Sequence, residues 1–292
     1  MSLSFLKSKI VLGTVQLGLP YGINNAQGKP NEEEAFRILD LALQNNISLL
    51  DTADAYGNAT EVIGAYLYRN PSATVEIINK FIDDNISLSV KFEKSLRLLS
   101  SNSLYAYMYH RFSDYSSGKF AKDLNRLKEE KKIMKVGVSV YSLQELEQVI
   151  ADTTVDLIQL PLSPFDYSHE KQELVKEAKA AGKEIHVRSV FLQGLLFKTP
   201  DQLTGNLKSL YEPLKKFHEI VHSLQLNARQ VCLNYAVHKA EIDHVLIGVD
   251  TATQLRENMD SILPYFDGEI MKKVESIVVS DVAMLNPSNW RP

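Results

Sequence analysis

The sequence predicts a single-domain (β/α)8 barrel, in which eight parallel strands alternate with helices. Two observations lead to this fold class. Short apolar segments rich in aliphatic and β-branched residues recur eight times, and segments with helical spacing of apolar residues separate them. Polar residues also come at or just after the ends of several predicted strands, where the chemistry of such barrels takes place. Although 292 residues is long for one domain, barrels of this class often reach that length, so we expect residues 1–292 to form one domain.

The strands are predicted first, from their apolar segments. They cover residues 10–13, 48–51, 76–80, 104–110, 135–139, 157–160, 184–189 and 245–248. The helices between them follow from apolar residues three and four apart. They cover residues 31–44, 61–69, 88–99, 120–131, 142–152, 171–181, 228–238 and 253–259. Asn31 with Glu34 resembles a capping box, and Gly182 is a suitable stop signal after the sixth helix.

Three further features complete the predicted architecture. Residues 199–223 are too long for an ordinary loop after the seventh strand and predict an extra helix or a flap. Residues 268–283 predict a C-terminal helix, and residues 286–292 an extended end. A doubly wound open sheet is the alternative fold, but Gly13 and Gly18 are five residues apart and do not form a dinucleotide-binding glycine motif.

Composition narrows the functional classes. The net charge of −4 and the scattered lysines argue against a nucleic-acid partner. The single cysteine, Cys232, lies in an apolar segment and predicts a buried thiol in a reducing cytoplasm. No segment has the length of a signal peptide or a membrane span, so we expect a soluble protein. His186, His218, His222, His238 and His244 show no metal-ligand spacing with acidic residues, so no metal site is expected.

Four polar residues form the candidate catalytic set. Asp51, Lys80 and His110 end three consecutive strands, and Tyr56 follows Asp51 by five residues. A lysine ammonium would move the pKa of Tyr56 down toward the working range, and Asp51 would keep Lys80 charged. His110 would donate a hydrogen bond to a substrate oxygen, so the set predicts protonation of a carbonyl oxygen during reduction. Taken singly, the aspartate is equally suited to a helix cap and the histidine to the core.

The chain resembles the aldo-keto reductase superfamily along nearly its whole length. The matching residues include Gly13 and Thr14, the segment from Asp51 to Gly57, Lys80, His110, residues 137–139, Gln159, residues 193–195 and residues 256–258. The resemblance implies a TIM barrel that binds an extended NAD(P)(H) without a Rossmann fold. It also implies that Tyr56 is the proton donor, that Lys80 and Asp51 tune it, and that His110 orients a small-molecule carbonyl substrate.

The resemblance further implies a set of cofactor contacts. Ser139 and Gln159 would hold the carboxamide, and Asp51 would lie near the nicotinamide ribose. Residues 189–195 would line the pyrophosphate, and residues after the eighth strand would meet the adenosine. The full predicted set is Gly13, Thr14, Asp51, Ser139, Gln159, Arg188, Ser189, Leu192, Gln193, Gly194, Gly248, Gln254, Glu257 and Asn258. Structural roles remain open for Ser139 as a helix cap, Gln193 as a turn residue and Glu257 as a solvated helix face.

The chain departs from the family pattern at two points. Asp250 and Gln254 stand where members that prefer the phosphorylated cofactor carry basic residues, so NAD(H) is expected to bind as well as NADP(H) or better. Arg188 replaces a common aromatic residue, and it either stacks on the nicotinamide, reaches an anionic substrate group or forms a rim salt bridge.

The substrate is less well defined by the sequence. Residues 187–196 resemble bacterial members of sugar and surface-polysaccharide pathways, which favours a polar or sugar-like carbonyl compound. A Schiff-base lyase or aldolase that uses Lys80 is one alternative. A nicotinamide-binding regulatory subunit with slow turnover is another, and the oligomeric state stays open.

Overall fold

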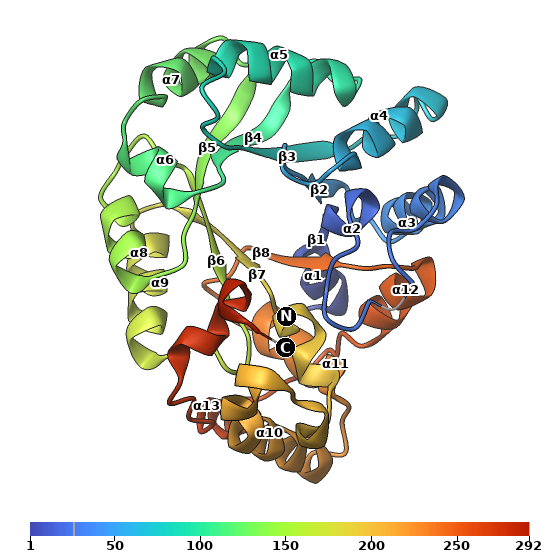
Figure 1. Cartoon of the computed structure of the whole chain (residues 1–292), viewed down its shortest axis with the longest axis vertical. Coiled ribbons are helices and arrows are strands. Elements are labelled where there is room, and N and C mark those ends of the chain that lie inside the picture. The colour runs from blue at the N-terminus through green and yellow to red at the C-terminus, as the bar shows by residue number, and fades with distance from the viewer. Residues whose placement is uncertain (26, 292) are drawn as a thin grey trace.

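The structure is a computed structural model that describes residues 1–25 and 27–291. Within these residues, eight strands form a closed parallel barrel in the order β1 to β8, and the helices surround it (Figure 1). The strands are β1 (Ile10–Gly13), β2 (Leu49–Asp51), β3 (Glu76–Phe81), β4 (Leu104–Tyr109), β5 (Ile133–Ser139), β6 (Leu157–Pro161), β7 (Glu184–Arg188) and β8 (His244–Gly248). The predicted (β/α)8 fold class is therefore confirmed, and the open sheet is wrong.

The crossover helices also lie close to their predicted positions. They are α3 (Glu32–Gln44), α4 (Ala59–Arg69), α5 (Leu88–Leu98), α7 (Ala121–Glu129), α8 (Leu143–Ile150), α9 (His169–Ala180), α11 (Ala228–Val237) and α12 (Ala252–Asp260). Asn31 caps α3 by accepting a hydrogen bond from the backbone of Glu34. The predicted capping box is only half formed, because the Glu34 carboxylate accepts from the backbone of Ala252 at the start of α12 instead.

Several elements were not predicted. Short helices α1 (Leu3–Ser8), α2 (Val15–Gly18) and α6 (Phe112–Ser116) are too brief to show a period in the sequence. The segment after β7 contains three 3-10 turns, η1 (Leu192–Phe197), η2 (Pro200–Gln202) and η3 (Gly205–Leu210), followed by α10 (Tyr211–Ser223). The predicted extra helix after the seventh strand is thus present as α10.

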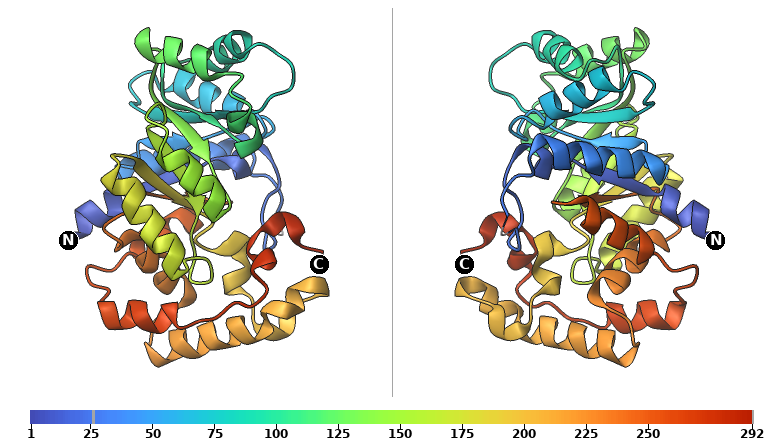
Figure 2. Two further views of the ribbon diagram at one scale, coloured as in Figure 1. Left: turned by 90° about the vertical axis from the view of Figure 1, so that its left-hand side faces the viewer. Right: turned by 90° about the vertical axis from the view of Figure 1, so that its right-hand side faces the viewer.

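The C-terminal prediction is partly wrong. The helix α13 (Gly268–Glu275) ends eight residues before the predicted end at residue 283. The chain then forms turns η4 (Val282–Leu285) and η5 (Pro287–Asn289), so the end is not fully extended, and Pro292 lies outside the described residues. Asn206 of η3 holds this tail by donating to the carbonyl of Asn289 and accepting from the backbone of Arg291. Figure 2 shows α1 and this tail on opposite sides of the molecule.

Side-chain alternation along the strands separates two cores. Inside the barrel, Val11, Leu49, Ile78, Ala106, Met108, Leu157 and Leu246 pack together. The other strand faces pack against the helices in a larger apolar cluster. The residue two positions beyond an interior side chain points the same way, so the interior face continues to the carboxyl ends of the strands. None of the described helices is long and apolar enough to cross a membrane.

Candidate active site

Asp51 and Lys80 form a buried ion pair at the carboxyl ends of β2 and β3. Their side chains are 2% and 1% exposed, and the Lys80 Nζ contacts Asp51 Oδ1. Gln159, from β6, donates its amide to the other carboxylate oxygen at 2.9 Å. Burial lowers the pKa of Lys80, and the adjacent Asp51 opposes this shift. The carboxylate is therefore fixed in one position by two donors from the barrel interior.

Tyr56 and His110 complete the cluster from the loop after β2 and the end of β4. The Lys80 Nζ lies 5.1 Å from the centre of the Tyr56 ring. The rings of Tyr56 and His110 meet edge to face, with centres 5.7 Å apart and an interplanar angle of 88°. All four residues of the predicted catalytic set therefore converge on one place, although they come from three consecutive strands and the loops that follow them.

The protonation states differ from the sequence-based expectation. Burial, with the charge of Asp51, raises the pKa of Tyr56 well above its ordinary value. The prediction that Lys80 lowers this pKa is wrong for this arrangement, because the ammonium is paired with Asp51. Burial and the neighbouring Lys80 lower the pKa of His110 to about 4. Tyr56 is thus a neutral phenol and His110 a neutral imidazole at physiological pH.

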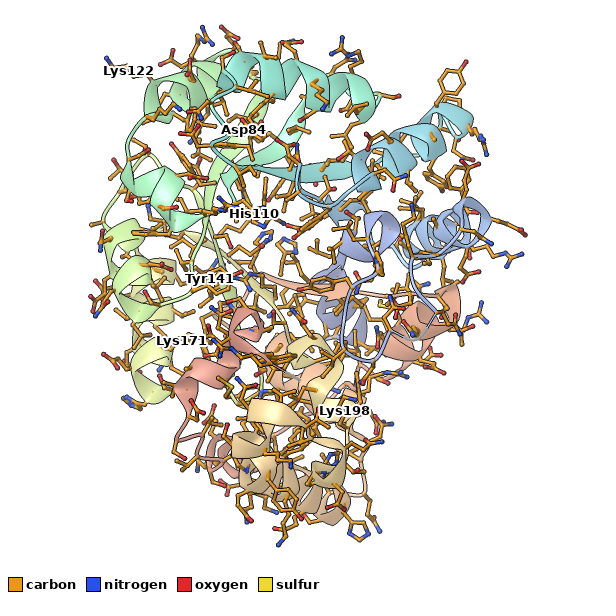
Figure 3. All side chains as sticks on the ribbon, in the orientation of Figure 1. Asp84, His110, Lys122, Tyr141, Lys171 and Lys198 are labelled. Carbon is orange, nitrogen blue, oxygen red and sulfur yellow. The ribbon has the colours of Figure 1, made fainter. Side chains whose placement is uncertain are left out.

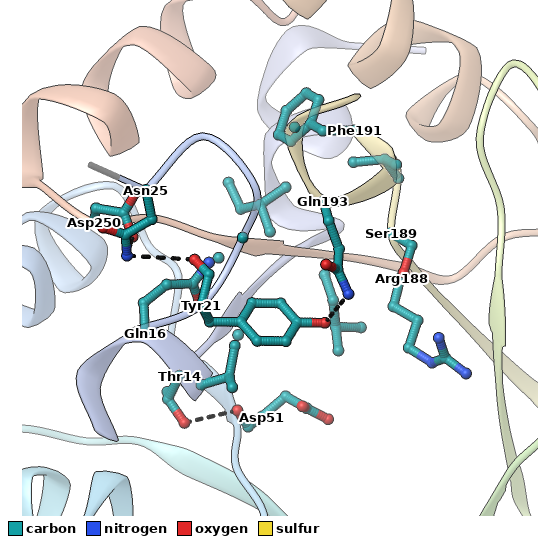
Figure 4. A pocket seen from close by; sticks show the side chains of 18 of the residues that line it. Thr14, Gln16, Tyr21, Asn25, Asp51, Arg188, Ser189, Phe191, Gln193 and Asp250 are labelled. Atoms are coloured by element: carbon teal, nitrogen blue, oxygen red, sulfur yellow. Dashed lines mark hydrogen bonds between the residues drawn. The ribbon is translucent and has the colours of Figure 1, made fainter. Parts of the chain in front are cut away.

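A cavity of about 410 Å³ opens next to this cluster. Tyr56, His110 and Asp51 line it. Figure 4 shows Asp51 and Asp250 at separate parts of the cavity. Most of the predicted cofactor contacts also line it, namely Gly13, Thr14, Ser139, Gln159, Arg188, Ser189, Gln193, Gly194, Gly248, Gln254 and Asn258. This volume is within the range of small-molecule and cofactor sites.

Three predicted site residues stand apart from the cavity lining in the described part of the chain. Lys80 is enclosed behind Asp51, and Leu192 is 1% exposed and packs in the core. Glu257 pairs with Arg229 at 2.6 Å, and its side chain is 49% exposed. The structural alternative for Glu257, a polar helix face, agrees with this position better than a direct cofactor contact does.

The loop after β1 supplies lining residues that the sequence analysis missed. Tyr21 lies across the cavity, and its hydroxyl accepts a hydrogen bond from Gln193 at 2.7 Å (Figure 4). The backbone of Ile23 donates to the Gln193 carbonyl at 3.2 Å, and Asn25 donates to Asp250 at 3.0 Å. The signal available in the sequence was length, because residues 19–31 exceed an ordinary βα loop and such loops are often functional.

The segment after β7 adopts an unusual backbone. Ser189, Leu192, Gln193 and Gly194 all have positive φ angles, between 46° and 91°. Side chains other than glycine tolerate this region poorly, so the turn is held by its surroundings, including the contacts with the loop after β1. Strained turns of this kind cluster at ligand-binding sites.

Gly248, at the end of β8, packs closely against the side chain of Gln16. A Cβ atom at this position would lie 2.3 Å from Oε1 of Gln16. That oxygen is buried and has no hydrogen-bond partner in the described residues. Nδ1 of His110 and Nε of Arg229 are also buried without a hydrogen-bond partner among the described residues. Both residues line the cavity. The wall therefore offers polar atoms that a bound ligand would satisfy.

A different polar cluster occupies the opposite end of the barrel. Glu184, His186 and His244, at the starts of β7 and β8, bring possible metal-ligating atoms within 4.8 Å of one another. The spacing of these histidines along the sequence did not reveal this grouping, which forms only in three dimensions. However, Lys135 contacts the Glu184 carboxylate, and the Tyr105 hydroxyl donates to it at 2.8 Å. These donors and His186, at 2.6 Å, already satisfy the carboxylate.

Comparison with known proteins agrees with the fold. The barrel resembles the holo form of aldo-keto reductase AKR11C1 from Bacillus halodurans with a TM-score of 0.75 and 19% identity, over 92% of this chain and 91% of that one. The apo form of the same enzyme gives a TM-score of 0.72 and 21% identity, over 85% and 87% of the two chains.

The sequence comparisons are consistent with this likeness. The aldo-keto reductase str7 of Strobilurus tenacellus is 26% identical over an alignment of 194 residues, and the match covers 60% of this chain. The matched region spans 56% of that relative. The profile of the aldo/keto reductase family matches residues 9–279. The chain therefore belongs to the aldo/keto reductase family.

Proposed function

We propose that this protein is an NAD(P)(H)-dependent oxidoreductase that reduces a polar aldehyde or ketone to an alcohol. The observation that carries the proposal is the convergence of Asp51, Lys80, Tyr56 and His110 beside a cavity of about 410 Å³. Family membership supports the reaction class.

The proposed roles follow from the charge state of each group. Tyr56 keeps its proton at neutral pH because burial raises its pKa. The phenol is therefore present to hydrogen-bond to a carbonyl oxygen and to transfer its proton as negative charge develops there. His110 is neutral, so it binds the same oxygen through a hydrogen bond without adding charge. The Asp51–Lys80 pair lies against the Tyr56 ring, where it fixes the position of the phenol and does not lower its pKa.

The residues of the cavity fit a nicotinamide dinucleotide. The bound cofactor would supply the hydride that the carbonyl carbon accepts. Ser139 lines the cavity with a hydroxyl, and Gln159, Gln254 and Asn258 line it with amides, of which Gln159 contacts Asp51 and Gln254 contacts the Asp250 backbone. The unpartnered Gln16 oxygen and His110 nitrogen match a ligand that brings its own polar groups.

We further propose that NAD(H) binds at least as well as NADP(H). The Asp250 carboxylate lines the cavity, where it accepts from Asn25, and Gln254 accepts from its backbone. A 2′-phosphate near this carboxylate would be repelled. Arg256 is exposed, and Arg229 pairs with the Glu257 carboxylate at 2.6 Å, which partly offsets its charge.

The Schiff-base alternative has less support. A lysine that attacks a carbonyl substrate must reach it as a free amine. Lys80 is 1% exposed and contacts Asp51, so a substrate in the cavity meets Tyr56 and His110 first.

The test is a panel of aldehydes and sugars assayed with NADH and NADPH, with Tyr56→Phe as the control. We expect Tyr56→Phe to reduce kcat by at least roughly 100-fold, because the proton donor is lost. Binding of the reduced cofactor, followed by fluorescence, should change little. Full activity in Tyr56→Phe would contradict the assigned proton donor. Cofactor binding without turnover of any carbonyl compound would favour the regulatory-subunit alternative.

A further inference from the structure

Arg188 presents an unpaired guanidinium to the cavity. It ends β7 and lines the cavity together with Tyr56 and His110. Among the described residues, no carboxylate lies within salt-bridge distance of it, so the predicted rim salt bridge is not formed. Its one hydrogen bond runs from Nη2 to the carbonyl of Val140 at 3.5 Å. A guanidinium carries five N–H donors, so most of its donor capacity is left for a ligand.

The Tyr141 ring packs against the flat face of this guanidinium. The central carbon of the guanidinium lies 4.1 Å from the centre of the Tyr141 ring. Stacking on an aromatic face leaves the N–H edges of the guanidinium free, and those edges match the two oxygens of a carboxylate or phosphate. Figure 4 shows Arg188 beside Ser189 on the side of the cavity away from Asn25 and Asp250, and Figure 3 shows Tyr141 in the same region as His110.

The charge of Arg188 is not neutralised by the groups around it near Tyr56 and His110. Asp51 and Lys80 neutralise each other as a buried pair. Tyr56 and His110 are neutral at physiological pH because of their raised and lowered pKa values, respectively. The end of the cavity at which we place the carbonyl group therefore carries one uncompensated positive charge.

We propose that Arg188 binds an anionic group of the substrate, a carboxylate or a phosphate, with Tyr141 as the positioning residue that fixes the guanidinium plane. The inference rests on the proposed carbonyl reduction and gives that reaction a substrate class. The substrate is then a carbonyl compound whose negatively charged oxygens reach Arg188 while its carbonyl oxygen meets Tyr56 and His110.

The experiment compares two matched pairs of aldehydes. One pair is 4-carboxybenzaldehyde and 4-methylbenzaldehyde, and the other is glyceraldehyde 3-phosphate and glyceraldehyde. The measured quantity is the ratio of kcat/KM for the anionic member to that for the neutral member. Because the same two aldehydes are used with every variant, comparing this ratio between variants removes the difference in their intrinsic reactivity. The first pair reports a carboxylate, and the second reports a phosphate.

We expect Arg188→Gln to lower this ratio by about 10- to 100-fold for at least one pair, mainly through KM of the anionic member. Arg188→Lys keeps the charge but loses the planar fork, so it should give an intermediate ratio. Tyr141→Leu should lower the ratio as well, and Tyr141→Phe, which keeps the ring, should restore it. Lys122→Gln removes one exposed positive charge on α7 and should leave activity unchanged.

An unchanged ratio in Arg188→Gln for both pairs would overturn the proposal. An equal loss for both members of a pair, with weaker NADH and NADPH binding by fluorescence titration, would also overturn it and would assign Arg188 to the cofactor. Failure of the reductase function itself would look different, because the unmodified enzyme would then reduce no member of either pair.

Discussion

At the scale of single residues, burial decides what Tyr56 and His110 can do. Tyr56 is a phenol whose pKa is raised by desolvation and by Asp51, so its proton is available for donation. The group that faces the cavity at neutral pH is therefore the neutral phenol.

The first prediction concerns pH. Because the pKa of His110 is lowered to about 4, the imidazole stays neutral down to that value. We expect kcat/KM for carbonyl reduction to show no step near pH 6.5, the ordinary range of histidine. Steady-state kinetics between about pH 5 and 8 check this. A step near 6.5 that vanishes in His110→Asn would contradict the neutral, buried imidazole.

The second prediction concerns the cofactor phosphate. Asp250→Asn removes the carboxylate and keeps the size of the side chain beside Asn25. The ratio of the NADPH to the NADH dissociation constant should fall by about tenfold, because one repulsive charge is lost. Fluorescence titration of both cofactors measures the ratio. Asp260→Asn, an exposed acid at the end of α12, is the matched control and should leave the ratio unchanged.

At the scale of elements, the contact between α2 and α4 fixes the loop that carries Tyr56. α2 packs against α4, and Gly18 at the end of α2 touches the backbone of the loop that carries Tyr56. A Cβ atom on Gly18 would lie 1.7 Å from the Tyr56 carbonyl oxygen, so the loop would have to move. The position of Tyr56, the proposed proton donor, thus depends on a glycine far from it in sequence.

The third prediction follows from this contact. Gly18→Ala should lower kcat, and it should lower the free energy of unfolding by about 1–3 kcal/mol through overpacking. Steady-state kinetics and denaturant unfolding measure the two effects. Gly268→Ala in α13 is the control, because its added Cβ meets nothing within 4 Å. Wild-type kcat in Gly18→Ala would show that the loop tolerates the displacement.

At the scale of the whole molecule, a polar network joins four strands at the amino-terminal end of the barrel. Tyr105 of β4, Lys135 of β5, Glu184 and His186 of β7, and His244 of β8 contact one another there. Burial lowers the pKa of His186 to about 3 and that of His244 to about 4. Both histidines are therefore neutral in the folded protein at neutral pH.

The fourth prediction is a loss of stability in acid. Unfolded histidines bind protons below about pH 6.5, whereas these two stay neutral until about pH 3 to 4 when folded. Above about pH 6.5 the two histidines are neutral in both the folded and the unfolded protein, so they make no pH-dependent contribution to stability. Below about pH 6.5 the unfolded protein binds more protons, so the free energy of unfolding falls as the pH drops. Each histidine contributes a slope of about 1.4 kcal/mol per pH unit.

Urea unfolding of wild type and His244→Gln between pH 4.5 and 7.5 checks this prediction. Since other histidines also titrate, the difference between the two proteins isolates the contribution of His244. We expect a shallower decline in the variant. Parallel curves would mean that His244 is already accessible to protons in the folded state.

Much of the site was predictable because strand alternation is local. Asp51, Lys80 and His110 each come two residues after an interior apolar side chain, namely Leu49, Ile78 and Met108. The period of two places such residues on the interior face, and parallel strands bring their carboxyl ends to the same rim. Gly13, Gln159 and Gly248 follow the same rule. The sequence by itself therefore determined the barrel, its rim and the identity of the polar residues on it.

Only the tertiary structure decided the electrostatic state and the outer wall of the site. The pairing of Lys80 with Asp51, the raised pKa of Tyr56, the Tyr141 ring against Arg188 and the contact of Tyr21 with Gln193 all join segments far apart in the chain. The histidine cluster at the opposite end arises in the same way. Burial and charge depend on distances through space, and a sequence pattern carries only distances along the chain.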